Sequence, residues 1–493
     1  MLRTALLTAL FLPVALIPAR AADPSPQGAM ALEAQLRSWM QGMAGPGMPV
    51  PARPVQVLAD GDHYVFTVPV GVAKAPAPAP VIQGTAKAID GGRWSFEGPY
   101  LPSPFTFVLD MPVPPKEGQK NSPVTVPVTY TVTGSGSSQG VFDPSLATAS
   151  NLTTNSRTLK IVAKSALIDQ QTDMARSDNS STLRPAGAGR VDFVSDGTIE
   201  GYTLRSKSSD LPATDLKIER ARIAGSLLSV SRERAAQMIP ALVGLTAGAM
   251  AGAPKAGSKI PPGTPSVDPQ LIRALVQSLQ DFASEFTIDE TLDGVSMAFG
   301  GSGGSASQVR IGLGAKSDGK LMAAHMDFGL DGLALPDLGL GAMAGLLPHK
   351  VTMRPSVTGV PIDELMKLLS DTSMNSAGPP PEFMAMLGRG TLGAGLDSFS
   401  FDTGGATFAG SGRVTMPTPD TIDGKAQITA TNFDALSQKL ASIPDLASVM
   451  PVVFTVKGMA KTVENRLVWD ITYSGSSLMV NGNDVSAMMG GSK

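Results

Sequence analysis

Residues 466–473, which read RLVWDITY, give the clearest indication of the fold. Leu467, Trp469 and Ile471 occupy every second position, and this period places their side chains on one face of a β-strand. A Ser-Gly turn and a second apolar segment at 478–480 follow directly. The end of the chain therefore predicts a β-hairpin with one apolar face.

Two helices are expected immediately before this hairpin. Residues 433–440 form the first, with Leu436 and Leu440 on its apolar face. The second begins at Pro444, and Pro451 is expected to kink or end it because proline lacks the backbone N–H that a helix interior requires. The tail therefore predicts helices that lie on an antiparallel sheet.

The period of two recurs along the whole chain, in short segments separated by turns rich in Gly, Ser and Asp. Strands are predicted at 55–58, 64–70, 85–89, 93–96, 105–109, 124–132, 159–168, 190–194, 198–205, 216–224, 285–299, 308–314, 321–329, 398–401, 406–408, 412–416 and 424–430. The Gly/Ser tracts 136–140 and 300–304 and the polar segment 177–181 are interpreted as loops or turns. The sequence thus predicts an α+β protein made mainly of antiparallel β-sheet.

Further helices are predicted where apolar residues recur at helical spacing. They cover 29–43, 235–253, 268–282, 361–370 and 381–387. A linker at 252–265, rich in Ala, Gly, Lys and Pro, is expected to separate an N-terminal half, 22–251, from a C-terminal half, 266–493. Each half should consist of a sheet with covering helices.

The first 21 residues have the pattern of a secretory signal peptide. Arg3 supplies positive charge, and residues 5–17 form a short apolar segment. Ala19 and Ala21 then fit the small residues that precede a cleavage site. Because the apolar segment is shorter than the ~20 residues that span a bilayer, cleavage is favoured over a retained membrane anchor. We expect export, with the periplasm as the location in a Gram-negative bacterium.

The composition excludes several classes of function. Cysteine is absent, so the chain has no disulfide, no thiolate nucleophile and no thiolate metal ligand. Of all residues 16% are charged, and the formal net charge is −3, which leaves no positive excess for holding nucleic acid. The hydrophobic fraction of 42% is too high for a disordered chain. We therefore expect a folded protein without a nucleic-acid partner.

The predicted helix 235–253 is uncharged and contains Gly244, Gly248 and Gly252 at a repeated spacing of four. This spacing lets two helices approach closely, so these glycines are candidates for helix packing or for oligomerisation. A membrane span is the alternative. It is disfavoured because Gln237, Pro240 and the many Gly and Ala residues contribute little apolar transfer energy.

Four short segments near the end of the chain carry a resemblance to known families. They read FDAL at 433–436, KGMA at 457–460, LVWDI at 467–471 and VNGNDV at 480–485. Together they resemble the bacterial domain of unknown function 2125, and the last of them is similar to the ending of YdgA-like periplasmic proteins. The resemblance implies an exported, β-rich protein without an assigned reaction, and it supplies no catalytic residues.

Three sequence strings match motifs of enzymes without the context that these motifs need. The strings at 136–140 and 300–304 match the Gly-x-Ser-x-Gly nucleophile elbow, which requires a strand that turns sharply into a helix. Residues 388–393 match the dinucleotide-binding fingerprint, but here a helix precedes the glycines and strands follow them. We interpret the first two as hairpin loops and the third as a helix end with a turn.

The ionisable residues do not form a recognisable metal site. His63, His325 and His349 lie far apart, and none has a second histidine at helical or strand spacing. Asp60 and Asp62 flank the turn before His63, a grouping that is more typical of a hydrogen-bonded turn than of a bound cation.

An acidic segment at 281–293 is the remaining candidate for binding a cation. It lacks the alternating ligands of an EF-hand loop and is interpreted as a solvated strand end. The sequence therefore predicts no catalytic residue, no metal ligand and no cofactor.

Three functions remain open at this point. The first is a non-catalytic periplasmic protein of envelope maintenance, whose curved sheet and apolar helices bind a lipid or another hydrophobic ligand. The alternative is a structural or interaction module that oligomerises, or docks a partner, through the glycine helix or an unpaired sheet edge. A serine hydrolase that uses Ser302 is the third. A continuous apolar groove would favour the first function, and a solid core the second.

Overall fold

The computed structural model describes most of the chain. The described residues are 24–43, 55–69, 81–99, 103–113, 124–146, 148–208, 212–235, 281–335, 341–365, 386, 391–403, 405–418, 421–475 and 477–486. Contacts divide the chain into two compact units, which we call unit 1, Met1–Ser284, and unit 2, Glu285–Lys493. Both units consist mainly of antiparallel β-sheet with a few helices, so the predicted α+β class is confirmed.

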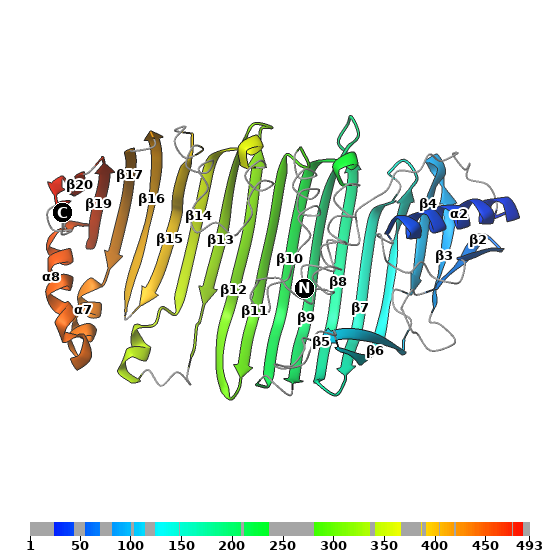
Figure 1. Cartoon of the computed structure of the whole chain (residues 1–493), viewed down its shortest axis with the longest axis horizontal. Coiled ribbons are helices and arrows are strands. Elements are labelled where there is room, and N and C mark those ends of the chain that lie inside the picture. The colour runs from blue at the N-terminus through cyan, green and yellow to red at the C-terminus, as the bar shows by residue number, and fades with distance from the viewer. Residues whose placement is uncertain are drawn as a thin grey trace. The chain divides into compact units, whose positions relative to one another are not determined.

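Unit 1 is built from ten strands in the described ranges (Figure 1). They are β1 Gln56–Asp60, β2 His63–Pro69, β3 Val81–Ile89, β4 Arg93–Pro99, β5 Phe105–Val113, β6 Val124–Asp143, β7 Thr148–Lys164, β8 Ile168–Pro185, β9 Arg190–Ser208 and β10 Thr214–Ser231. Successive strands pair antiparallel, except that β4 and β5 share one edge of the long strand β6. A single turn, η1 Asp90–Gly92, joins β3 to β4. Hairpins of this kind bring residues that are close in the sequence into register.

One helix, α2 Pro26–Met43, packs on the first strands of unit 1. Ser25 caps it, because the Ser25 Oγ accepts a hydrogen bond from the Gly28 N–H at 3.1 Å. The Ser25 N–H in turn donates to the Tyr64 hydroxyl at 3.1 Å, which ties the start of the helix to β2. The helix buries Ala29 and Leu32 against a core that includes Trp94. The predicted helix 29–43 is thus present and begins three residues earlier, at Pro26.

Unit 2 repeats the same construction. Its strands are β11 Glu285–Phe299, β12 Ser302–Ser317, β13 Leu321–Asp331, β14 Lys350–Pro361, β15 Gly393–Thr403, β16 Ala406–Thr418, β17 Thr421–Thr431, β18 Lys461–Val463, β19 Arg466–Ser474, β20 Ser477–Val480 and β21 Asn483–Asp484. From β11 to β17 each strand pairs antiparallel with the next, and β17 then pairs with β19. The helices between them whose bounds are fully described are η3 Gly341–Leu346, α7 Phe433–Ala441, η4 Pro444–Val449 and α8 Met450–Gly458.

The terminal hairpin agrees with the sequence prediction. β19 and β20 pair through Ile471 and Val480, and Leu467, Trp469 and Ile471 all belong to one apolar cluster. The helix predicted from Pro444 differs in detail. A 3₁₀ helix ends at Val449, and Pro451 lies in the first turn of α8 instead of ending a helix. Proline is tolerated there because the first N–H groups of a helix have no partner within it.

Two tracts that the sequence assigned to turns lie within long strands. Residues 177–181 are in the middle of β8, and 136–140 are in the middle of β6. Their backbone groups are paired with neighbouring strands on both edges, so weak strand propensity does not interrupt the sheet. Gly140 is also needed there, because a Cβ would lie 2.7 Å from the Phe96 ring. The prediction of turns was therefore wrong at both places.

Unit 2 begins later than residue 266, the predicted start of the C-terminal half. The Ser231 N–H at the end of β10 donates to the Phe282 carbonyl at 2.8 Å, so residues just before Glu285 are held by unit 1. The predicted linker 252–265 lies outside the described residues and stays a prediction. The same holds for the signal segment 1–21 and for most of the predicted helices 235–253, 268–282, 361–370 and 381–387.

Candidate functional site: an apolar sheet face

The strand register of unit 2 places large apolar side chains on one side of the sheet. Across β12 and β13, Val309 pairs with Leu330, Ile311 with Phe328, and Leu313 with Met326. Residues that pair directly in an antiparallel sheet project from the same side, and alternate residues project from the other. The three pairs therefore form an apolar patch across two strands.

The same side continues over the neighbouring strands. Met353 on β14 pairs with Phe399 on β15, and Phe401 pairs with Phe408 on β16. We call this side the apolar face. Its larger described residues are Phe286, Ile288, Leu292, Val309, Ile311, Leu313, Met326, Phe328, Leu330, Val351, Met353, Leu396, Phe399, Phe401, Phe408, Val414 and Ile428.

The opposite side of the same strands is polar. Arg354 lies between two carboxylates there, with Nη1 3.5 Å from Asp327 Oδ1 and Nε 3.9 Å from Asp397 Oδ2. Thr352, which neighbours Met353 in the sequence, pairs with Ser400 on this side. The sheet is therefore amphipathic, with its charge on one side and its apolar surface on the other.

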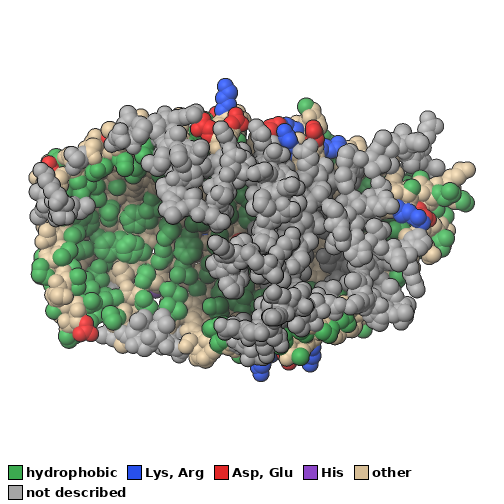
Figure 2. All heavy atoms as spheres, in the orientation of Figure 1, with side chains coloured by type: hydrophobic (Ala, Val, Ile, Leu, Met, Phe, Trp, Pro, Cys, Tyr) green, Lys and Arg blue, Asp and Glu red, His purple; other side chains and the backbone are tan. Residues whose placement is uncertain are grey.

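Much of the apolar face is accessible to solvent. Ile311, Leu313, Met326 and Met353 are each between 38% and 41% exposed, and Val414 is 43% exposed. Figure 2 shows hydrophobic side chains gathered on a hollowed surface over the strands that Figure 1 labels β13 to β17. Soluble proteins rarely expose a large contiguous apolar patch without a binding role, so this face is the candidate functional site.

Two helices cover one end of the apolar face. Phe433 of α7 contacts Phe408 edge to face, with ring centroids 6.0 Å apart, and it also lies against Trp469 of β19. The Trp469 Nε1–H donates to the Val456 carbonyl of α8 at 2.8 Å. These contacts bury the sheet around Ala430 and Trp469, while the exposed residues named above lie on β12 to β16.

Helix α8 is largely apolar, with Thr455 and Lys457 as its polar side chains. None of its residues is buried, and Val452 and Phe454 are each 60% exposed. It lies next to the covered end of the apolar face, through Val453 in the apolar cluster around Phe433. The helix therefore extends the apolar surface beyond the sheet.

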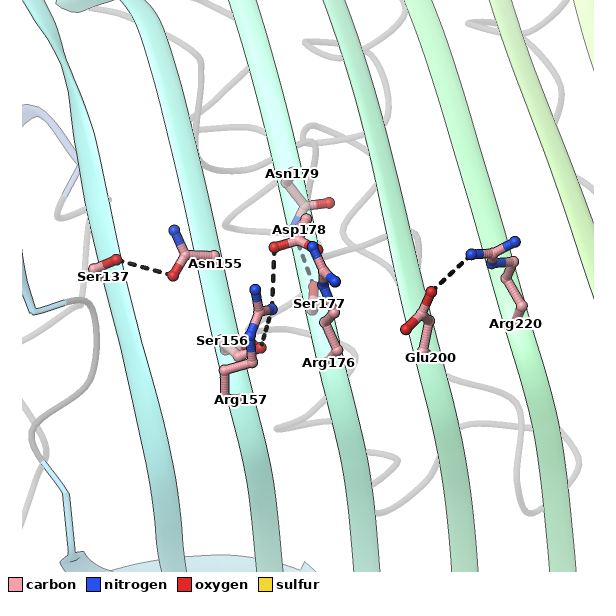
Figure 3. A network of polar contacts seen from close by, with 10 residues as sticks. All are labelled: Ser137, Asn155, Ser156, Arg157, Arg176, Ser177, Asp178, Asn179, Glu200 and Arg220. Atoms are coloured by element: carbon pink, nitrogen blue, oxygen red, sulfur yellow. Dashed lines mark hydrogen bonds and ion pairs between the residues drawn. The ribbon is translucent and has the colours of Figure 1, made fainter.

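The long strands of unit 1 have a different character (Figure 3). On one side, Arg157 and Arg176 both donate to Asp178, and Arg220 pairs with Glu200 at 2.8 Å. Burial pushes the pKa of Asp178 up, but the hydrogen bonds from the two arginines outweigh it and the pKa lies below its ordinary value. This network pairs opposite charges across neighbouring strands, which stabilises the sheet on that side.

His63, a candidate from the sequence, opens β2 and contacts its neighbour. Its Nδ1 lies 3.0 Å from Asp62 Oδ1, and Lys87 Nζ donates to Asp62 Oδ2 at 2.6 Å. The hydrogen bonds from Lys87 and His63 lower the pKa of Asp62 to about 2. The turn thus holds an ion pair of exposed side chains.

The other histidines and acids of the described chain do not gather into one cluster. His325 projects from the polar side of β13, 3.6 Å from Asp327. Asp281 pairs with Arg190. The remaining acids of the segment 281–293 lie within β11 and not in a loop. Among the described residues, no group of three His, Asp or Glu side chains could hold a metal ion.

Neither elbow-like string leads from a strand into a helix: 300–304 contains the turn between β11 and β12, as expected, and 136–140 lies within β6. Ser302 opens β12 directly after the turn at Gly300 and Gly301, and Ser138 pairs with Gly98 within the sheet. Of the dinucleotide-like string 388–393, only the end is described, at the start of β15. The predicted cleavage residues Ala19 and Ala21 and the helix-packing residues Gly244, Gly248 and Gly252 lie outside the described residues.

Sequence reasoning missed the apolar face as a unit. The alternation that produces it is visible within single strands, for example at 309–313 and at 351–353. What the sequence lacks is the register that aligns these short apolar stripes across neighbouring strands.

Comparisons with known proteins returned no match among protein-family models, curated proteins or solved structures. No helix in the described part of the chain is both long and apolar enough to cross a membrane.

Proposed function

We propose that this protein is a non-catalytic binding protein for lipid acyl chains, and that the apolar face of unit 2 is the binding surface. The observation that carries the proposal is the row of large, half-exposed apolar side chains from β12 to β16, with Met353 near its centre. Covering these side chains with hydrocarbon removes apolar surface from water, which is favourable in proportion to the area covered.

The dimensions of the face suit an acyl chain. The distance from β12 to β16 is four strand spacings, about 19 Å. One acyl chain spans roughly half of the ~30 Å hydrocarbon core of a bilayer. A single chain therefore fits across the exposed strands.

The side chains of the face also favour a flexible apolar ligand. Met326 and Met353 carry unbranched thioethers that adapt to ligands of varying shape. Gly410 and Gly412 pair with Phe399 and Leu396 on the same side, and the Phe399 ring lies over Gly410. Such a surface binds hydrocarbon without requiring one defined geometry.

Export to the periplasm and a role in envelope maintenance are part of this proposal. They rest on the signal-like segment 1–21 and on the resemblance of the last sixty or so residues to the domain of unknown function 2125. An exported protein that binds acyl chains would meet its ligands at the membranes that enclose the periplasm.

Binding of cis-parinaric acid, a fatty acid that fluoresces in apolar surroundings, tests the proposal. We expect the full chain to enhance its fluorescence, and Met353→Glu to weaken the binding at least about tenfold, because a carboxylate facing the acyl chain loses hydration. Thr352→Glu is the matched control. It adds the same charge one residue away on the polar side, and it should change the affinity less than about twofold.

Absence of parinarate binding by the wild-type chain would contradict the proposal. An equal loss of parinarate affinity in Met353→Glu and Thr352→Glu would contradict it as well. The alternative, an interaction module, predicts a different result. In that case the wild-type chain would form dimers in analytical ultracentrifugation, Met353→Glu would be monomeric, and no fatty acid would bind.

A further inference from the structure

A separate cavity lies in unit 1, between helix α2 and the sheet beneath it. Its volume is about 230 Å³. Leu32, Gln35 and Leu36 of α2 form one wall, and β2, β3, β4, β6 and β7 provide the rest. The cavity belongs to unit 1 alone and shares no residue with the apolar face.

The lining of this cavity is apolar and neutral. Its hydrophobic members on the sheet are Phe66, Val68, Ile82, Ala86, Trp94, Phe96, Phe142, Ala149 and Leu152. Three residues with hydroxyl side chains, Ser138, Thr148 and Thr154, also line it, and none of the described residues around it is charged. An ionised ligand would therefore lose its hydration without gaining a counter-charge.

Two residues of the lining each carry a buried polar atom that has no partner among the described residues. They are the Gln35 Oε1, an acceptor, and the Trp94 Nε1–H, a donor. The Gln35 residue is 6% exposed and Trp94 is 2% exposed, so water outside the protein does not reach these atoms freely. Buried polar groups are nearly always hydrogen-bonded, and an unpaired one is destabilising.

The structure fixes both of these side chains. Gln35 lies on the buried side of α2, one turn from Leu32, whose side chain is in the core. Trp94 contacts Tyr64 edge to face at a centroid distance of 5.4 Å, and its backbone pairs with Ala88 on one edge and Phe142 on the other. Neither side chain can turn to solvent without unpacking this core.

We propose that the cavity binds a neutral, aliphatic alcohol-like molecule, and that its hydroxyl accepts from the Trp94 Nε1–H and donates to the Gln35 Oε1. A hydroxyl group is both donor and acceptor, so a single group has the chemistry to pair with both atoms. The hydrocarbon part fills the apolar remainder of the cavity.

The volume sets the size of the ligand. An apolar cavity of about 150 Å³ binds benzene, which has six non-hydrogen atoms. By proportion, 230 Å³ accommodates about nine such atoms. 1-Octanol and n-nonane both have this size, and they differ in the hydroxyl group alone.

The test compares these two probes on the full chain by titration calorimetry. We expect 1-octanol to bind at least about tenfold more tightly than n-nonane, because nonane leaves both polar atoms unpaired. Trp94→Phe keeps an aromatic ring and removes the donor, and Gln35→Met keeps the length of the side chain and removes the acceptor. Each variant should weaken octanol binding, leave nonane binding unchanged or stronger, and so reduce the preference several-fold.

Two further variants separate this site from the rest of the molecule. Ala149→Leu fills the cavity and should abolish binding of both probes, with folding checked by circular dichroism. Met353→Glu alters the apolar face of unit 2 and should leave the octanol preference unchanged. Loss of the preference in Met353→Glu would overturn the inference, because the probes would then bind at the other face.

A second measurement gives an answer even if a variant folds poorly. The wild-type chain has three tryptophans, and the indole N–H signal of Trp94 is the one absent from Trp94→Phe. Octanol should move this signal downfield as the N–H gains an acceptor, and nonane should not. Equal affinities for the two probes, or an unmoved Trp94 signal, would show that the cavity holds no alcohol and would overturn the inference.

Discussion

Unit 1 and unit 2 treat the apolar side of an antiparallel sheet in opposite ways. In unit 1, helix α2 lies over β1 to β4, and Val57, Tyr64 and Trp94 are buried beneath it. In unit 2, α7 and α8 cover one end, and Met353 and its neighbours stay half-exposed. The comparison shows that one strand pattern serves either as a closed core or as an accessible surface, depending on the helix above it.

The difference has an energetic meaning. A buried side chain contributes to stability through the apolar area that it loses on folding, and a half-exposed one contributes much less. A ligand can still cover apolar surface that remains exposed after folding. Removing that surface from water then contributes favourable free energy to binding. Unit 1 is therefore expected to depend strongly on the apolar contacts under α2 for its stability, and unit 2 to depend much less on the residues of its exposed face.

The largest expected effect concerns the covered core. Trp94→Ala should destabilise unit 1 by about 3–5 kcal/mol, because it leaves a large cavity among packed residues. Met353→Ala, on the exposed face of unit 2, should cost less than about 1 kcal/mol. Hydrogen exchange measured on peptides of each unit reports the two effects separately. If Trp94→Ala and Met353→Ala lost similar amounts of stability, the distinction between a covered and an accessible face would not hold.

The helix that covers the sheet is the next target. A Cβ at Gly28 would collide with the Tyr64 hydroxyl, so Gly28→Ala should loosen the contact of α2 with β2 at a cost of about 1–3 kcal/mol. Unit 1 would then expose apolar surface as unit 2 does, and binding of the dye ANS should rise.

Met30→Ala is the control for this variant. Met30 lies on the same helix and is 72% exposed, so its truncation should leave both stability and dye binding unchanged. A Gly28→Ala variant that behaves like Met30→Ala would show that α2 is not required to close the sheet.

The smallest expected effect concerns the polar side of unit 1. The pKa of Asp178 is lower in the folded chain than its ordinary value of 3.8, so its ion pairs stabilise the fold above that pH. The stabilisation is lost as the pH falls through the lower, folded pKa. Asp178→Asn should therefore cost less than about 1 kcal/mol at pH 6, and the cost should disappear in strong acid.

Urea unfolding across this pH range measures the difference in stability between Asp178→Asn and the wild type. A difference that grows as the pH falls would mean that the folded pKa of Asp178 is raised, not lowered. The effect is expected to stay small because the side chains of Arg157 and Arg176 are about half exposed and solvent screens the pairs.

Much of the fold could be predicted because its signals are local. The alternation at Leu467, Trp469 and Ile471 predicted a strand with one apolar face, and these residues do share a cluster. The helix 29–43 followed from apolar spacing in the same way. The prediction of turns was wrong at the Gly/Ser tract 136–140 and at the polar segment 177–181. Their strand conformation depends on pairing with neighbouring strands on both edges and not on their own strand propensity.

The candidate sites were beyond sequence reasoning for a related reason. Val309, Met353 and Phe401 lie far apart in the sequence, and it is the register of successive strands that joins them into one face. Gln35 and Trp94 meet at one cavity because α2 packs across the sheet. No sequence motif marks either of these two sets of residues.

The sequence by itself determined which segments are strands with an apolar and a polar side, because a period of two is a property of neighbouring residues. Only the tertiary structure decided which of these apolar sides is covered. That outcome depends on strand register and on where α2, α7 and α8 pack, and both are set by contacts between residues that are distant along the chain.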